Sequence, residues 1–68
     1  MNVENFNMEL RKFLKKVGVS SQASIEKSIN EAIADGRLKG DETLDAKMTL
    51  TIDSVDLTFD IEGRISLN

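Results

Sequence analysis

The spacing of apolar side chains constrains this 68-residue chain more than any other feature, because it changes once, near residue 40. Before that point apolar residues recur with the helical period of about 3.6 residues, and after it they alternate with polar residues as in a half-buried strand. Asn2 or Asn5 can cap a first helix, and Gly18 can end it. The apolar stripe that predicts this helix consists of Phe6, Leu10, Phe13, Leu14 and Val17.

A second helix is predicted after a short connection. Ile25, Ile29 and Ile33 recur every fourth residue, and Gly36 follows where such a helix would end. Residues 19–21 include two serines, which are preferred capping residues, so they predict a turn between two helices. Two helices joined by so short a turn are expected to pack as a helical hairpin or a crossed pair.

The last third of the chain alternates apolar and polar residues and predicts a β-hairpin with one apolar face. Asp53 and Ser54 are expected to form a two-residue turn, so that Ile52 lies opposite Val55. Gly63 interrupts the row of large residues and predicts a bulge or a bend in the second strand.

The predicted register can be tested by its charge pairs. It places Lys47 opposite Asp60, which is favourable, and Asp45 opposite Glu62, which is not, with Arg64 diagonally nearby. A slip by one residue would turn the whole apolar set to water. A four-residue loop around the same centre would keep the same pairs.

Together these patterns predict an α+β fold in a single domain, residues 1–68, with two N-terminal helices packed on a C-terminal antiparallel β-hairpin in the order ααββ. A chain of this length buries only about 60% of its unfolded surface, and an isolated two-stranded hairpin is marginally stable. No cysteine is present to form a disulfide. A homodimer is therefore expected, in which the hairpins of two chains either combine into one sheet or stack face to face.

The residue types that are missing exclude most catalytic chemistries. The chain has no His, Cys, Trp or Tyr, so Ser-His, Cys-His and zinc-hydroxide mechanisms lack their essential groups. A Ser-Lys pair is conceivable within residues 15–24, although serine caps beside exposed lysines account for the same residues. The hairpin acids do not follow a calcium-loop spacing, and those that share a face spread along about 20 Å of strand. We therefore expect no enzyme activity, no catalytic residue, no cofactor and no metal site.

Charge is distributed unevenly along the chain, whose net charge is −3. Residues 1–40 carry seven Lys or Arg and five acids, whereas residues 41–68 carry two and seven. In the predicted first helix, Lys15 and Lys16 would occupy the last turn, where the helix dipole favours cations. The candidate interaction surface consists of the basic cluster of this helix and two connector residues: Arg11, Lys12, Lys15, Lys16, Arg37 and Lys39.

Several interpretations of this basic surface stay open. A solvated helix face explains it without any function, and as a functional surface it would bind phosphate, a membrane surface or an acidic protein. The order helix, turn, helix, hairpin also matches the outline of a winged-helix DNA-binding domain. The second predicted helix, however, carries Lys27 against Glu26, Glu31 and Asp35, whereas DNA binding relies on neutralised phosphates. A non-enzymatic protein-interaction or regulatory module is therefore the expected function, with nucleic-acid binding through the basic face as the alternative.

Three segments resemble a family of small bacterial proteins of unknown function: FNMELRKFLKKVGVSSQ, GRLKGDETLDAKMTLTI and IEGRISL. The resemblance covers most of the chain, implies a bacterial cytoplasmic protein and adds no activity. The polar, periodic N-terminus lacks the apolar run of a signal peptide or a membrane span, which also places the protein in the cytoplasm. The expected partners are a second copy of the chain and an unidentified protein.

Overall fold

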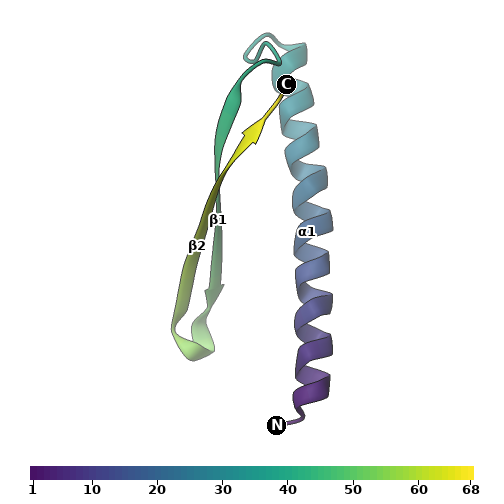
Figure 1. The fold of residues 1–68 in the computed structure, drawn as a ribbon, viewed down its shortest axis with the longest axis vertical. Coiled ribbons are helices and arrows are strands. Elements are labelled where there is room, and N and C mark those ends of the chain that lie inside the picture. Colours follow the sequence, from purple (N-terminus) through teal and green to yellow (C-terminus); the bar gives the residue numbers. More distant parts are fainter. The chain divides into compact units, whose positions relative to one another are not determined.

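The computed structural model describes all 68 residues and contains one helix and one β-hairpin (Figure 1). Helix α1 spans Val3–Ala34, strand β1 spans Thr43–Ile52, a short 3₁₀ turn spans Asp53–Val55, and strand β2 spans Leu57–Ser66. The chain divides into two compact units, Met1–Arg37 and Leu38–Asn68, and each is described by itself. The predicted α+β class is confirmed, with one helix fewer than the sequence indicates.

The ends of α1 lie where capping residues in the sequence place them. Asn2 has an extended backbone, and its side-chain oxygen accepts a hydrogen bond of 3.0 Å from the backbone N–H of Asn5. This bond satisfies one of the N–H groups that the first turn leaves without a helical partner. At the other end Gly36 has a φ of +86°, which glycine adopts without strain. The predicted cap at Asn2 and the predicted stop at Gly36 are both confirmed.

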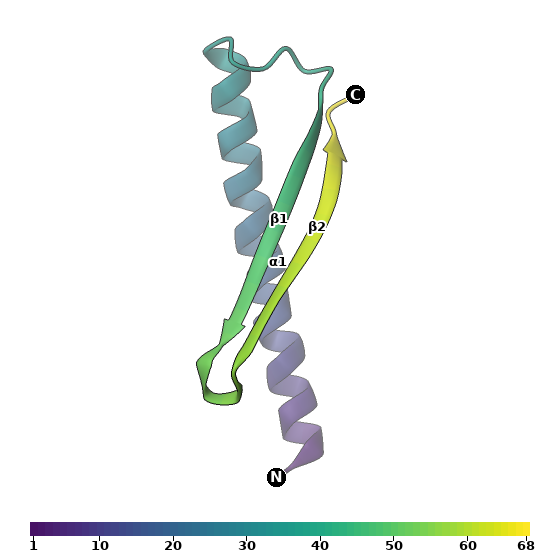
Figure 2. The same cartoon turned by 90° about the vertical axis from the view of Figure 1, so that its left-hand side faces the viewer.

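The predicted break between two helices is wrong. α1 is continuous over 32 residues, about 48 Å, and passes through Gly18 and residues 19–21 (Figure 2). Gly18 is not among the glycines with a positive φ, so it costs only the roughly 1 kcal/mol by which an interior glycine is less favourable than alanine. Without a turn the chain has no helix-turn-helix, so the winged-helix outline is lost as well.

The apolar stripe explains why the helix continues. Ser21 lies four residues after Val17 and four before Ile25, so the two predicted stripes are in phase across the supposed connection. Ser21 is half-buried, as Val17 and Ile29 are, which places it within the stripe. The chain contains no proline to interrupt the helical hydrogen bonds.

Strands β1 and β2 pair antiparallel along their full lengths, in a register two residues away from the predicted one. Ile52 lies opposite Leu57 and not opposite Val55. Because the shift is even, every side chain keeps its predicted face. Gly63 pairs with Ala46 in an uninterrupted ladder, so of the predicted bulge or bend at Gly63 the bulge is absent.

A four-residue loop accounts for the shifted register. Residues Asp53–Val55 form the 3₁₀ turn, and Asp56 follows with a φ of +53° in the left-handed region. The N–H of Asp56 donates to the carbonyl of Asp53 at 3.1 Å, which closes the loop. Aspartate is one of the few residues other than glycine that adopt this conformation routinely.

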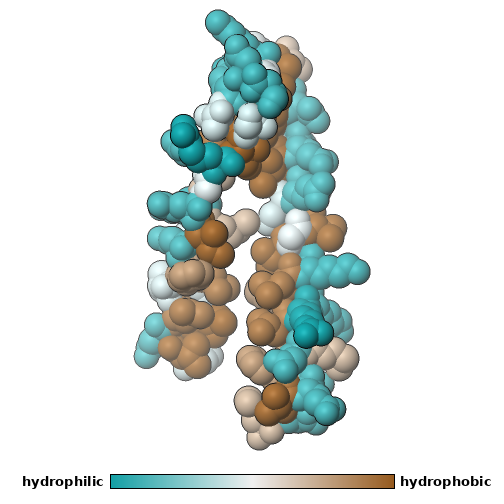
Figure 3. All heavy atoms as spheres, viewed as in Figure 1, coloured by the Kyte–Doolittle hydropathy of each residue, from teal (hydrophilic) through white to brown (hydrophobic).

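Very little of the chain is buried. Ala32 is the only buried residue, with an exposed fraction of 7%. Large apolar side chains of both units reach the surface, as the brown atoms along the helix and the hairpin show (Figure 3). Neither unit therefore encloses a hydrophobic core of its own.

Candidate interaction surfaces

One side of α1 carries a row of apolar side chains, called here the helix stripe. It consists of Phe6, Leu10, Phe13, Leu14, Val17, Ile25, Ile29 and Ile33. The exposed members range from 38% for Ile25 to 54% for Leu14. An amphipathic helix gains most of its stability from packing such a stripe against another surface. No helix in the structure combines the length and the apolarity that crossing a bilayer requires.

The hairpin presents a second apolar surface, called here the hairpin face. Strand β1 contributes Leu44, Ala46, Met48, Leu50 and Ile52, and strand β2 contributes Leu57, Phe59, Ile61 and Ile65. Phe59 and Ile61 are exposed to 52% and 57%. A two-stranded hairpin with an uncovered apolar face is marginally stable in water, so this surface also needs a cover.

The opposite face of the hairpin carries polar side chains that pair across the strands. Arg64 Nε lies 3.3 Å from Asp45 Oδ1, and the Thr49 hydroxyl donates to Asp60 Oδ1 at 2.7 Å. The register also places Lys47 opposite Glu62, so each charge faces a partner. No three acidic side chains come together in a group that could hold a metal ion.

A shallow hollow of about 550 Å³ lies where the two smallest residues of the hairpin face each other. It is lined by Asp45, Ala46, Lys47, Glu62, Gly63 and Arg64. A Cβ atom added at Gly63 would meet nothing within 4 Å, so nothing in the chain fills this space. The hollow was not foreseen, because only the observed register brings Ala46 and Gly63 together. Its charged lining residues face one another across the strands, Asp45 opposite Arg64 and Lys47 opposite Glu62.

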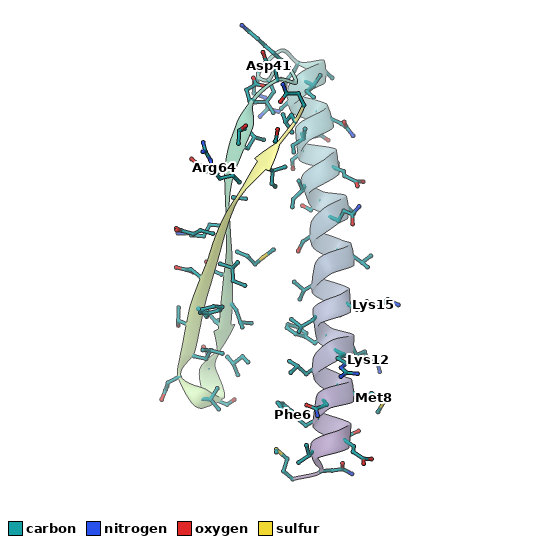
Figure 4. The ribbon with its side chains drawn as sticks, viewed as in Figure 1. Phe6, Met8, Lys12, Lys15, Asp41 and Arg64 are labelled. Atoms are coloured by element: carbon teal, nitrogen blue, oxygen red, sulfur yellow. The ribbon has the colours of Figure 1, made fainter.

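The basic cluster lies on α1, as predicted, but in the middle of the helix. Lys12 and Lys15 project, together with Met8, from the side of α1 opposite to Phe6 (Figure 4). The two salt bridges of the structure involve none of the cluster residues Arg11, Lys12, Lys15 and Lys16. α1 continues well past the cluster and has no basic residue in its last turn, so the expected dipole explanation of these cations is wrong.

Of the two connector cations, Arg37 does not join this cluster. About 27 Å of helix axis separates Lys16 from Ala34, and Arg37 follows beyond the helix end. Arg37 Nε lies 2.8 Å from the Asp35 carboxylate, and this contact lowers the pKa of Asp35. Lys39 belongs to the second unit. The four cations of α1 are therefore the part of the candidate surface that a single element holds together.

Glu42 organises the segment that leads into β1. Its carboxylate accepts backbone N–H groups from Lys39 at 2.9 Å, Gly40 at 2.9 Å and Asp41 at 3.2 Å. These bonds, those from Lys39 and Gly40 first, hold the pKa of Glu42 below its usual value. Gly40 has a φ of +105°, a conformation that disfavours any side chain there.

A Glu42→Gln variant is expected to lose stability at neutral pH and to match the wild type in acid. The pKa of Glu42 is lower in the folded chain than in the unfolded chain. Its charge therefore stabilises the fold above the unfolded-state pKa, and this stabilisation is lost as the pH falls through the folded-state value. Thermal midpoints across the acid range measure the effect, with Asp41→Asn as the control. A gap between variant and wild type that stays constant with pH would contradict the prediction.

Comparison with known proteins gives a family and no activity. The whole chain, residues 1–68, matches the model of a family described only as a family of unknown function. No curated protein and no solved structure matches the chain. The family resemblance noted in the sequence is confirmed. The surfaces of the molecule are therefore the features from which a function can be inferred.

Proposed function

Because the chain belongs to the family of unknown function DUF6494, which brings no activity with it, we propose a function from its surfaces: a non-enzymatic protein-interaction module that works as a homodimer. One observation carries the proposal. Ala32 is the only buried residue, while the helix stripe and the hairpin face both stay largely exposed. Monomeric proteins rarely expose large continuous apolar patches, and those that do use them as interaction sites.

A second copy of the chain is the partner that its composition favours. The chain has no cysteine for a disulfide, so a small fold of this kind depends on apolar contacts for stability. Each half-exposed Leu, Ile or Phe that becomes buried contributes about 1 kcal/mol. In a symmetric dimer every such contact occurs twice, because both copies use the same surface. Sheet extension between two hairpins is one way to combine the two hairpin faces.

The basic cluster supports a second contact, with an acidic protein partner. Its four cations have no ion pair in the chain. Two of them, Lys12 and Lys15, project away from the side of α1 that holds Phe6 of the helix stripe (Figure 4). Fluorescence anisotropy with polyglutamate and with single-stranded RNA tests this contact. Binding of polyglutamate supports it, whereas binding of RNA alone, with a steep salt dependence, would favour nucleic acid as the partner.

A matched pair of variants tests self-association through the helix stripe. Phe6 and Met8 are both large, exposed and near the start of α1, but only Phe6 belongs to the stripe (Figure 4). Phe6→Ser should weaken the dimer more than tenfold, because it removes about 2 kcal/mol of burial from the two copies together. Met8→Ser should leave the dimer unchanged.

Light-scattering mass over a range of concentrations measures both variants against the wild type. The wild type is expected at twice its 7.6 kDa chain mass in the high micromolar range. A wild-type mass equal to that of one chain under these conditions would contradict the proposal. Equal weakening by both substitutions would show that the helix stripe is not the contact.

A further inference from the structure

The hydrogen bonds of the hairpin decide which backbone groups face its open edges. The N–H of Leu67 donates to the carbonyl of Glu42 at 2.9 Å, so these two residues form a hydrogen-bonded pair just beyond the strands. Such pairs alternate along an antiparallel ladder, and therefore every even-numbered residue of β1 bonds to β2. The odd-numbered residues of β1 direct their N–H and C=O groups to the open edge: Thr43, Asp45, Lys47, Thr49 and Thr51.

The edge of β1 is well suited to pair with another strand. Three of its five outward residues are threonines, which favour strands, and its two charges cancel. It contains no proline and no bulge, two of the features by which natural sheets block an open edge, and its one lysine is balanced by Asp45. The edge of β2 is less suited, because Asp60 and Glu62 outweigh Arg64 and because Gly63 lies within the strand.

Only one symmetric way to pair β1 with a copy of itself makes the two charges of its edge, Asp45 and Lys47, face each other. A two-fold axis at Lys47 would place this lysine opposite its own copy, and an axis at Asp45 would do the same for the aspartate. An axis at Ala46, between them, places Asp45 opposite Lys47 of the second copy and Lys47 opposite its Asp45. Opposite charges in directly facing positions stabilise a pair of strands. The same axis brings the two Ala46–Gly63 pairs side by side across the sheet.

We infer that two copies of this chain join through their β1 edges, antiparallel about a two-fold axis at Ala46, into a four-stranded sheet in the order β2–β1–β1–β2. Asp45 and Lys47 are the residues that select the partner. The inference rests on the proposed self-association and specifies its geometry. An isolated hairpin becomes part of a sheet of ordinary width, with both hairpin faces combined into one apolar surface.

Reciprocal charge variants test this edge. Lys47→Glu leaves two acids on the β1 edge, and Asp45→Lys leaves two cations, so each variant alone should dimerise at least about tenfold more weakly than the wild type. In an equimolar mixture every facing pair is attractive again. The mixture should therefore form a one-to-one heterodimer, which native mass spectrometry identifies after one variant is labelled with ¹⁵N.

Two further variants distinguish an effect on the β1 edge contact from an effect on the stability of the hairpin. Arg64→Glu disturbs a cross-strand pair to the same degree but leaves the β1 edge intact, so it should remain a dimer. Lys47→Glu combined with Glu62→Lys restores the charge pair within the hairpin and should keep the fold. This double variant should still dimerise weakly by itself. It should form a heterodimer when it is mixed with Asp45→Lys. Single variants that dimerise like the wild type would overturn the edge inference while leaving self-association standing. A monomeric wild type would instead defeat the proposed function.

Discussion

A Ser21→Pro variant should lose about 3 kcal/mol of stability and much of its helical signal. Proline at position 21 removes the N–H that bonds to the carbonyl of Val17, and its ring clashes with that carbonyl. A chain of this length has a total stability of roughly 3–10 kcal/mol, so the loss is a large share of it. Circular dichroism at the helix minimum and the thermal midpoint both measure the change.

Two controls make this result specific to the middle of α1. Ser21→Ala should be neutral or slightly stabilising, because alanine is the best helix former. Val3→Pro should be tolerated, because Val3 is the first helical residue and Asn2 before it already has the extended backbone that precedes a proline. A Ser21→Pro variant that kept its full helical signal would show that the chain breaks near residue 21 after all.

The second large effect is expected on the hairpin face. Leu50 is half-buried and lies opposite Phe59, so Leu50→Asp places a charge in the apolar row. We expect a loss of about 3 kcal/mol once the face is covered, from lost burial together with the cost of desolvating the carboxylate. The hairpin should then lose its folded amide signals in NMR spectra, while signals of the first turns of α1 persist.

The neighbouring residue supplies the matched control for this substitution. Thr51 is exposed on the polar face opposite Thr58, and Thr51→Asp should change stability by about 0.5 kcal/mol or less. Both variants introduce the same residue into β1, so the low strand propensity of aspartate cancels in the comparison. Equal losses from the two substitutions would mean that the two faces of the hairpin are not distinguished by burial.

The sequence predicts the local features of this fold well, because each depends on a few neighbouring residues. The cap at Asn2, the stop at Gly36 and the assignment of side chains to hairpin faces all follow from short-range rules. The break expected at Gly18 fails for a different reason. A glycine followed by serines is compatible with both a turn and a helix interior, and the in-phase stripe through Ser21 decides between them.

The strand register shows what an alternating pattern leaves undetermined. Any even shift keeps the apolar residues on one face, so alternation alone cannot distinguish the predicted pairs from the observed ones. The charges could have done so, because only the observed register gives both Asp45 and Lys47 an opposite charge across the strands. The position of the four-residue loop, one residue later along the chain than expected, was missed because its left-handed position holds Asp56, where a glycine would have been a clearer signal.

Of the candidate surface, the sequence places Arg11, Lys12, Lys15 and Lys16 on one helix, and the structure has them on α1. The ion pair between Arg37 and Asp35 depends on the chain geometry just after the helix, which residue spacing does not reveal. The exposure of the helix stripe could not be predicted from the sequence either, because a pattern that indicates a buried face does not say what covers it.

The acids along β2 also limit how far the four-stranded sheet of two joined copies can grow. Once the β1 strands are joined, the open edges belong to β2, and chains added there would lengthen a ribbon without end. Asp60 and Glu62, with Asp56 in the adjoining loop, present negative charge to any strand that approaches. Charged edges are a common natural safeguard against amyloid-like stacking. Residues 41–68 hold seven of the twelve acids of the chain, and the three at the open edge of β2 or beside it would oppose fibre formation by such a sheet.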